Sequence, residues 1–573
     1  MDKEFFHRDL RLFLERRVDW QRYLNLRRGG TPDVAEELAT YESILSTLGD
    51  ICEDIEAASR PHWSDEVQLV DGAVVPPPHI VSGYEKLRQA GLVSLPIGAD
   101  YGGYGLPILV NCGYLEMVAR ADASLMTIVG LQAGVAGDIE RYGSPELKQR
   151  YLPRFASGEL QGCMDLTEPQ AGSDLGAIAT RVSEEHGRFF IDGAKIFITN
   201  GGAPIHLVLA RDGATYEQSK GTTNGLNLML CPVELPDGRR NGVRVARVEH
   251  KMGIHGSPTC AIEFDHAEAY LLGERGNGFR AMLDLMNNAR LGVAAQAIGI
   301  AHAAYRRARL YAAERVQFGA PIISQPVVKS MLTVCAVVIQ SARALLYRTC
   351  ALVDLADAIQ HRLAREGGEP AVDRVALQAE LERSVQLIRF FTPLCKYYAT
   401  EVANHVTRTG IQVHGGIGYM AESAAGHFHS DSIITTIYEG TSEIQASFAL
   451  REMSKGALFT ALEQTRQELE SIVDRFPEEV RAVRDGIDAL VQSVPALMDD
   501  PSYALLNAKR VCDMVIDVVV SAELLFQACE DDERRVLASV FIHRQMLAVD
   551  MNAKRIQSGD ASRLKRYDEI LGL

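Results

Sequence analysis

The residue that could do acid–base chemistry most readily is Glu439, which lies in the stretch Thr435–Gln445, TTIYEGTSEIQ. The next residue is Gly440, and glycine adopts backbone angles that other residues resist, so the chain can project the acid into a cleft. From Thr441 onward the stretch resembles a helix cap, because a hydroxyl satisfies free amide groups and an acid suits the first turn. A glutamate in this setting usually lies on a solvated loop, so its interpretation depends on the motifs upstream.

Four other loops share this density of glycine and small polar residues. They are LTEPQAGSD (166–174), FITNGG (197–202), RVQFGAP (315–321) and IQVHGGIGYM (411–420). Taken alone, a loop such as LTEPQAGSD is as readily a proline–glycine turn as a binding site. These five loops are the candidates for the chemistry of the chain.

The sequence lacks the motifs of several common nucleotide, hydrolase and metal sites. No GxGxxG opens a helix after a predicted strand and no GxxxxGK[ST] occurs, which argues against a Rossmann or P-loop nucleotide site. No HExxH is present, and no GxSxG stands between a strand and a helix. The ten cysteines form no CxxC pair and no histidine cluster accompanies them, so we expect no metal ion.

Composition limits the class of protein. A chain of 573 residues is too long for one core, so several domains are expected. Its 47% hydrophobic and 23% charged content is ordinary for a soluble globular protein. The net charge of −16 argues against a nucleic acid partner, because phosphate backbones bind clustered Lys and Arg.

The sequence also indicates the cellular compartment of the protein. The N-terminal stretch MDKEFFHRDLRLFLERRVDW is charged and lacks the apolar core of a secretory signal. No apolar run approaches the roughly 18 residues of a membrane span. The scattered cysteines are interpreted as buried thiols in a reducing compartment. We therefore expect a cytoplasmic protein without membrane insertion.

The elements that must position the five loops follow from hydrophobic periodicity. Residues 1–161 read as a mainly helical domain, with an exposed, extended loop at 61–80 around three consecutive prolines. Residues 162–273 contain short segments rich in Val, Ile, Leu and Phe at period 2, which predicts an antiparallel sandwich or barrel. Residues 274–454 hold four long apolar-striped helices, typical of a bundle, and 455–573 continue as an added helical domain. The predicted fold class is mainly α with a central β domain.

In order and spacing, the five loops make the chain resemble the acyl-CoA dehydrogenase family of flavoenzymes, over about residues 80–460. The extra helices at both ends resemble the larger bacterial members, which act on fatty acyl-CoA or methylthio-propionyl-CoA. The resemblance implies bound FAD, an acyl-CoA substrate, an electron-transfer flavoprotein as partner, and a homodimer or dimer of dimers. It places the protein in fatty acid β-oxidation and lipid metabolism.

The resemblance assigns roles along the first loop. Thr167 would donate its hydroxyl near flavin N5, and the backbone of Asp165 and Leu166 would face the pyrimidine ring. Ser173 would bind the flavin pyrophosphate, because a short hydroxyl and backbone amides hold phosphate without a bulky cation.

In the second loop, Phe197 stands where many relatives carry Trp. It would cover the flavin by stacking, without the hydrogen bond of an indole. Thr199 would touch the flavin as well.

Two further loops resemble family segments that reach the FAD of a neighbouring subunit. Arg315 would neutralise the pyrophosphate with its fork of donors. The glycines of the later loop would allow close approach to the adenosine half. The remaining residues implied at the cofactor are Gln317, Phe318, Gln412, Gly415, Gly416 and Thr441.

The resemblance also identifies the base. Some relatives carry a catalytic glutamate just before the arginine that matches Arg290, but this chain has Ala289 there, which cannot accept a proton. Glu439 is then the catalytic residue. The residues implied at the substrate are Ser173, Asn287, Arg290, Tyr438 and Gly440. One departure is Ser430-Asp431, where relatives usually have Arg-Asp, so the support of the catalytic loop differs.

The implied reaction removes hydrogen from the α- and β-carbons of an acyl-CoA thioester and gives the trans-2-enoyl-CoA. Hydrogen bonds from the base's own N–H and a flavin ribityl hydroxyl would polarise the thioester carbonyl. Glu439, desolvated and with a raised pKa, would take the α-proton, and flavin N5 would accept the β-hydride.

Two alternatives remain open. An acyl-CoA oxidase would share the fold and the base but pass its electrons to oxygen. A catalytically degenerate relative would serve as a scaffold or assembly protein, and the retained Glu439, Thr167, Ser173 and Arg315 argue against it.

Overall fold

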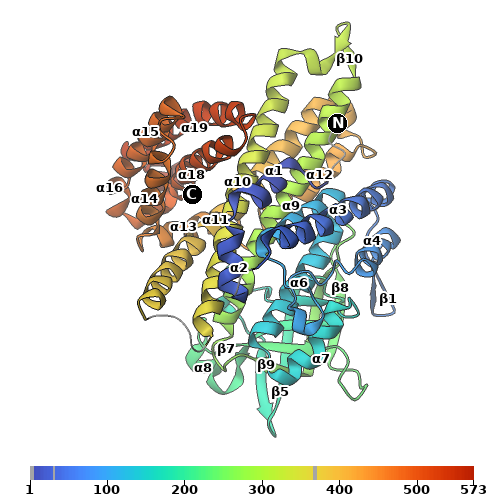
Figure 1. Cartoon of the computed structure of the whole chain (residues 1–573). Coiled ribbons are helices and arrows are strands. Elements are labelled where there is room, and N and C mark those ends of the chain that lie inside the picture. The colour runs from blue at the N-terminus through green and yellow to red at the C-terminus, as the bar shows by residue number, and fades with distance from the viewer. Residues whose placement is uncertain (1–4, 30–31, 366–370) are drawn as a thin grey trace. The chain divides into compact units, whose positions relative to one another are not determined.

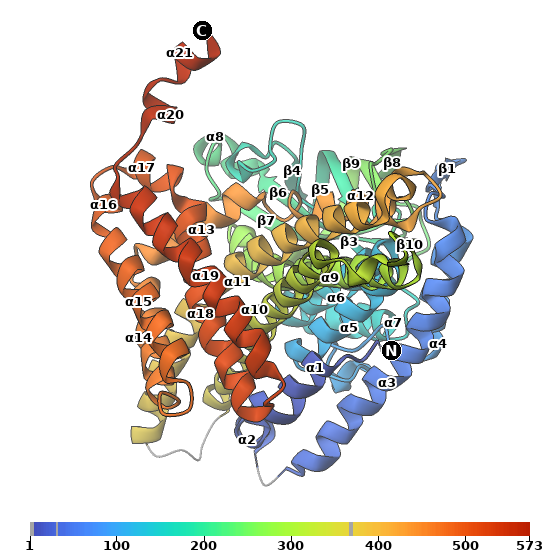
Figure 2. The same ribbon diagram turned by 90° about the horizontal axis from the view of Figure 1, so that it is seen from above.

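The computed structural model of the protein describes residues 5–29, 32–365 and 371–573 (Figures 1 and 2). The chain folds as two compact units. Unit 1 consists of Met1–Phe6, Ala39–Arg307 and Gly410–Thr435, and unit 2 of His7–Leu38, Ala308–Thr409 and Thr436–Leu573. Three long helices, α3 (Val34–Ser59), α9 (Gly278–Glu314) and α11 (Ala371–His414), each contribute residues to both units.

Unit 1 combines helices with a β-sheet (Figure 1). Its remaining helices are α4 (Pro78–Gln89), α5 (Ile108–Ala121), α6 (Ala123–Tyr142), α7 (Pro145–Ala156), α8 (Tyr216–Ser219) and α12 (Ala424–Thr435). The strands of its main sheet are β3 (Gly162–Asp165), β4 (Arg181–Glu185), β5 (Arg188–Thr199), β6 (Ile205–Asp212), β7 (Leu226–Pro232), β8 (Val243–Val248) and β9 (Thr259–Leu272). Pairing runs β6–β4–β5–β9–β7 and returns from β7 to β6, so these five strands close into a barrel.

Both faces of the barrel wall are buried at β6 and β7. Leu207 and Leu209 pack in a core shared with α6 and α7, whereas Val208 and Ala210 pack in the other core with residues of β7 and β9. The alternation of side chains along a strand explains this division. The apolar runs of β6 and β7 therefore face helices on one side and the barrel interior on the other.

The described residues of unit 2 are helical apart from one short hairpin. Its elements are α1 (Arg8–Leu12), α2 (Trp20–Arg28), β10 (Val316–Gln317), β11 (Ala320–Pro321), α10 (Pro326–Ala364), α13 (Ser442–Met453), α14 (Ala457–Glu470), α15 (Pro477–Ser493), α16 (Pro495–Met498), α17 (Pro501–Leu506), α18 (Ala508–Glu530), α19 (Arg534–Gln557), α20 (Ser562–Lys565) and α21 (Tyr567–Leu571). The central element of the added C-terminal helices is α18, which packs against α10, α13, α14, α15 and α19. Figure 2 shows α20 and α21 running away from these helices to the C-terminus.

One helix of the described residues, α10, is long and apolar enough to cross a membrane, but 61% of its most apolar window is buried inside the protein. Burial of that extent is also found in core helices of soluble proteins, and α10 packs here against α2, α18 and α19. The absence of membrane insertion stays a prediction.

The predicted fold class is confirmed: helices come first, a barrel-like sheet follows, and helices complete the chain. The limits predicted for the four domains stay predictions. The loop expected at 61–80 is wrong in one respect, because β1 (Gln68–Val70) and β2 (Ala73–Val75) form an exposed hairpin there. Asp71 and Gly72 both have positive φ, as the tight turn of a two-residue hairpin requires, and this Asp-Gly signal was visible in the sequence.

A buried ion cluster joins the two ends of the chain inside unit 2. Asp9 of α1 accepts a hydrogen bond from Arg343 of α10, at 2.7 Å, and forms an ion pair with Arg534 of α19. All three side chains are buried. Burial alone would raise the pKa of Asp9, but the two guanidinium groups outweigh it and hold that pKa well below its usual range.

Replacing Asp9→Asn is expected to destabilise the protein by about 3–5 kcal/mol, because two buried arginines lose their counter-charge. Chemical denaturation at pH 7 measures the difference, and the exposed neighbour Glu15→Gln is the control, expected within about 0.5 kcal/mol. Since the folded pKa of Asp9 is depressed, its contribution is present above the unfolded value and shrinks as pH falls below about 4. Equal stability of Asp9→Asn and wild type would contradict this account.

Candidate active site

The loop that carries Glu439 lies in unit 2 and leads directly into α13. Glu439 has φ +56° and Gly440 has φ +97°, so two consecutive residues are left-handed. For glutamate this conformation costs about 1–2 kcal/mol, so the surroundings must hold it. Thr441 is the helix N-cap, as the sequence predicts, and its hydroxyl accepts a hydrogen bond from the N–H of Ile444 at 3.4 Å. The Glu439 side chain is half-buried.

Two fully buried side chains hold the carbonyl groups of this turn. Gln445 Nε2 donates to the carbonyl oxygen of Glu439 at 2.7 Å and to that of Gly440 at 3.2 Å. Lys396 Nζ, from α11, donates to the Gly440 carbonyl oxygen at 2.7 Å. Tyr438, predicted at the substrate, is half-buried in the same turn. The backbone around the predicted base is therefore fixed from two helices.

The loop predicted to run along the flavin lies in unit 1 and follows β3. Leu166 is buried, Thr167 is half-buried and Ser173 is exposed. The carbonyl oxygen of Thr167 accepts a hydrogen bond from the N–H of Ile196 at 2.9 Å. This bond brings the first and second predicted flavin loops side by side.

Lys195 holds the same loop from inside the barrel. Its fully buried ammonium group donates to the carbonyl oxygens of Leu166 (2.9 Å) and Leu209 (2.8 Å) and to the carboxylate of Glu168 (2.8 Å). Burial lowers the pKa of Lys195, and Glu168 opposes that shift. Burial acts to raise the pKa of Glu168, but Lys195 outweighs it and the pKa lies below its usual range.

Phe197 is presented to solvent at an irregular point of β5. Its φ is +60°, the residue is 59% exposed, and the pairing of β5 with β9 shifts register there. An exposed aromatic ring in a strained backbone is typical of a binding surface. Thr199, half-buried, follows on the same strand, and at Gly172 no heavy atom lies within 4 Å of where a Cβ would stand. A flat aromatic face beside hydroxyl groups and an open loop fits a flavin ring.

Asp165 is placed differently from its neighbours in the loop. Its side chain is buried and bonds His206 Nδ1 at 2.9 Å, and Cys163 Sγ lies 3.1 Å from both groups. Burial raises the pKa of the Cys163 thiol, so it remains protonated. Only the backbone of Asp165 is left for the pyrimidine contact that the sequence predicts.

Arg315, Gln317 and Phe318 are exposed around the β10–β11 hairpin of unit 2. Phe318 and Gly319 both have positive φ, which gives the tight turn of a two-residue hairpin. Phe318 as a whole residue is 93% exposed. An apolar ring held this far from its own core suits contact with another molecule.

Gln412, Gly415 and Gly416 lie in unit 1, at the end of α11 and in the turn after it, and all three are exposed. Around both glycines no heavy atom lies within 4 Å of a Cβ position, so another molecule can approach the backbone closely. A cavity of about 290 Å³ opens at this segment, lined by Arg60, Arg307, His414, Ile417, Met420, Glu422, Ser423 and Ala424. Arg60 and Arg307 bring positive charge to this cavity, but Arg307 already pairs with Glu56 at 2.7 Å and Glu422 also lines the wall.

Asn287 and Arg290 lie one turn apart on the part of α9 that belongs to unit 1. Arg290 is buried and its Nη1 donates to Asn287 Oδ1 at 3.0 Å. Ala289 packs against the core between the barrel and α6–α7. The structure therefore brings together two of the five predicted substrate residues.

Asp431, of the unusual Ser430-Asp431 pair, anchors α12 within unit 1. Its Oδ1 accepts a hydrogen bond from the N–H of Ile254 at 2.5 Å. Burial raises the pKa of Asp431 to about 7, although the hydrogen bond from the Ile254 N–H acts to lower that pKa. A Cβ at Gly253 would lie 2.5 Å from the Ser430 backbone, so this approach requires glycine.

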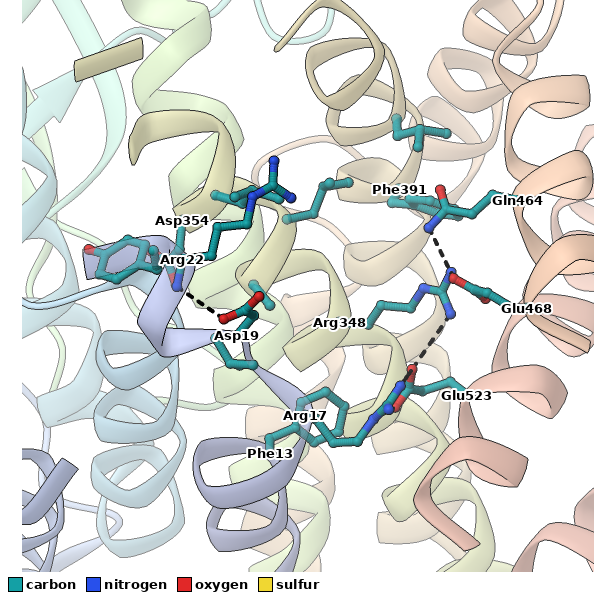
Figure 3. Close-up of a pocket in the computed structure, with 16 residues that line it drawn as sticks. Phe13, Arg17, Asp19, Arg22, Arg348, Asp354, Phe391, Gln464, Glu468 and Glu523 are labelled. Carbon is teal, nitrogen blue, oxygen red and sulfur yellow. Dashed lines mark hydrogen bonds and ion pairs between the residues drawn. The ribbon is translucent and has the colours of Figure 1, made fainter. Parts of the chain in front are cut away.

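A second cavity, of about 240 Å³, lies in unit 2 (Figure 3). Its wall carries ion pairs between Arg17 and Glu523 (3.0 Å) and between Arg348 and Glu468 (2.8 Å). None of the predicted site residues lines it. Opposite charges already neutralise one another there, so we interpret this cavity as part of the ion network between N-terminal and C-terminal segments of unit 2.

Comparison with known protein families gives three consecutive matches. Residues 63–159, 163–267 and 276–454 match the acyl-CoA dehydrogenase N-terminal, middle and C-terminal domains. The chain is 35% identical over 441 residues to 3-methylmercaptopropionyl-CoA dehydrogenase of Ruegeria pomeroyi, covering 72% of this chain and 71% of that protein.

Solved structures agree in fold. Acyl-CoA dehydrogenase complexed with FAD from Bacillus anthracis superposes with a TM-score of 0.74 at 21% identity, covering 90% of this chain and 88% of that one. Caenorhabditis elegans ACDH-11 in complex with C11-CoA gives a TM-score of 0.76 at 19% identity, covering 98% of this chain and 95% of that one. The similarity extends through the added C-terminal helices.

Sequence reasoning missed the residues that support the loops: Lys195, Glu168, Lys396 and Gln445. One signal was present for Lys396, because the charged residue stands between Leu394-Cys395 and Tyr397-Tyr398 in a helical stretch. A lysine on an apolar stripe of a helix indicates a buried ammonium group that needs a partner.

Replacing Lys195→Met is expected to lower the flavin content of the purified protein and to destabilise it by about 3–5 kcal/mol, because the buried Glu168 loses its counter-charge. The ratio of flavin to protein absorbance and the thermal midpoint measure both effects. The exposed Lys220→Met is the control. Unchanged flavin content and midpoint in Lys195→Met would refute the role of Lys195.

The raised pKa of Asp431 predicts how the stability of the protein changes with pH. Because its folded pKa is raised, its contribution to stability is complete below about pH 4 and is lost as pH rises through about 7. Stability of Asp431→Asn should therefore decline less than that of wild type between pH 5 and 8. Denaturant midpoints across this range test it, with Asp50→Asn, exposed on α3, as control. Parallel pH profiles for wild type and Asp431→Asn would contradict the prediction.

Proposed function

The chain belongs to the acyl-CoA dehydrogenase family and is an FAD-dependent oxidoreductase, and from this premise we propose that Glu439 removes the α-proton of an acyl-CoA thioester. The family, the enzyme class and the cofactor expected from the sequence are thereby confirmed. The catalytic residue, the acyl group and the electron acceptor are proposals.

The observation that carries the proposal is the conformation at Glu439. A non-glycine residue is held left-handed by buried donors, and strain of this kind is typical of functional sites. A half-buried carboxylate is a stronger base than a solvated one, because desolvation disfavours its charged form. Ala289 offers no alternative base at the position that some relatives use.

Each step of the proposed reaction is assigned to particular residues. We propose that Glu439 takes the α-proton, while its own N–H donates to the thioester carbonyl and stabilises the developing enolate. The proposed substrate contacts are Ser173, Asn287, Arg290, Tyr438 and Gly440. FAD, when bound, accepts the hydride that leaves the β-carbon.

The proposed FAD contacts extend over several loops of the chain. Phe197 stacks on the ring, Thr167 and Thr199 donate hydroxyl groups, and the backbone of Asp165 and Leu166 faces the pyrimidine. The remaining contacts are Ser173, Arg315, Gln317, Phe318, Gln412, Gly415, Gly416 and Thr441.

Assembly and electron transfer complete the proposal. The exposed Phe318 hairpin and the open glycines at 415–416 support contact with a second subunit, in a homodimer or dimer of dimers. Electrons pass to an electron-transfer flavoprotein in the cytoplasm. The relative from Ruegeria supports a methylthio-acyl-CoA or another short acyl-CoA as substrate.

An acyl-CoA oxidase is the alternative within enzymes. Peroxide release on turnover in air would favour the oxidase, whereas turnover that depends on an electron-transfer flavoprotein would favour the dehydrogenase. A purified protein without flavin absorbance would favour a scaffold role.

Replacing Glu439→Gln is expected to keep FAD and acyl-CoA binding but to slow anaerobic flavin bleaching by about 10³-fold, because the amide cannot take a proton. Stopped-flow absorbance with butyryl-, octanoyl- and 3-methylthiopropionyl-CoA measures it. Glu443→Gln, an exposed acid at the start of α13, is the matched control. Bleaching of Glu439→Gln at the wild-type rate would reject the assignment.

A further inference from the structure

We propose that Lys396 and Gln445 are positioning residues for the reaction: together they fix the left-handed backbone at Glu439 and Gly440 and so aim the catalytic carboxylate. The inference rests on the proposed function of Glu439. It assigns a reaction-specific task to two side chains that touch neither substrate nor cofactor in that proposal.

The contacts converge on two adjacent carbonyl groups. Lys396 Nζ and Gln445 Nε2 reach the Gly440 carbonyl oxygen at 2.7 and 3.2 Å, and Gln445 also reaches that of Glu439 at 2.7 Å. The donors come from different helices, α11 and α13, so the turn is held from two directions. Rotation of either peptide plane would break at least one of these bonds.

The turn is also closely packed. A Cβ on Gly440 would lie 2.7 Å from Gln445 Nε2. Glycine is therefore required at this position both by its φ of +97° and by the closeness of Gln445. The fit leaves little freedom for the backbone that carries Glu439.

The burial of Lys396 indicates what this side chain does. Both side chains are fully buried. An ammonium group is costly to bury unless it is bonded, and an apolar side chain of similar length would fill the same space without that cost. A buried lysine bonded to the turn next to the base is best explained by the need to hold that turn.

The added C-terminal helices support both donors. Tyr397, the residue after Lys396, donates its hydroxyl to Asp513 Oδ1 of α18 at 2.8 Å. Cys512 Sγ of α18 lies 3.9 Å from the carbonyl oxygen of Ala446, the residue after Gln445. Through α18, the extension braces the two helices that position the base, which gives it a role inside the subunit.

The test compares Lys396→Met and Gln445→Met with wild type. Flavin content and circular dichroism establish folding, and stopped-flow bleaching is followed with butyryl-, octanoyl- and 3-methylthiopropionyl-CoA. We expect unchanged dissociation constants for the acyl-CoA. The reduction rate should fall about 10²-fold for Lys396→Met and about 10-fold for Gln445→Met, since a displacement near 1 Å costs about 10²-fold.

A kinetic isotope effect separates positioning from general weakening. With the α,α-dideuterated form of the fastest acyl-CoA, both variants should show a larger isotope effect than wild type, because a displaced base makes proton removal more rate-limiting. Thr392→Val is the matched control. It lies one turn before Lys396, is equally buried, and its hydroxyl has no hydrogen-bond partner among the described residues.

The outcomes are distinguishable. If wild type is not bleached by any of the three thioesters, the proposed function fails. If wild type is bleached but both variants match its rate and isotope effect, the positioning role is overturned and Glu439 stands. If Lys396→Met does not fold, Gln445→Met decides alone, because it removes a neutral donor and leaves the buried charge in place.

Discussion

A buried ammonium group that binds the backbone of a loop is the interaction on which this structure depends. Lys195 does so in unit 1, at the Leu166 carbonyl of the proposed flavin loop, and Lys396 does so in unit 2, at the Gly440 carbonyl of the proposed catalytic turn. Each is fully buried, and each adds a charge where an apolar side chain would pack. Loops that must present groups to a ligand cannot be buried themselves, so their rigidity comes from charged donors beneath them.

Three residues of the candidate site have a strained backbone. Glu439, Phe197 and Phe318 all have positive φ, and none is a residue that adopts it readily. Glu439 is held by donors from two helices, Phe197 follows Lys195 at a shift of strand register, and Phe318 stands at a hairpin tip. At each of these three positions the unusual backbone angle turns the side chain away from the core of the protein.

The sequence predicted those features that depend on local chemistry. The Gly440 break, the Thr441 cap and the alternating strands of the barrel all follow from neighbouring residues. It also predicted Glu439 as the base, through the family's motifs and the alanine at 289. What it could not predict are partners distant in the chain, such as Lys396 with Gly440 or Asp9 with Arg343 and Arg534. A lysine among apolar residues indicates burial but does not name the carbonyl that it binds.

The central claim is that Glu439 is the base and that its backbone is fixed before substrate arrives. A crystal structure of the protein with FAD and an unreactive 3-thia-acyl-CoA tests it most directly. The account predicts a Glu439 carboxylate oxygen about 3–3.5 Å from the α-carbon, with Lys396 still bonded to the Gly440 carbonyl. A carboxylate turned away from the α-carbon, with another acid in its place, would contradict it.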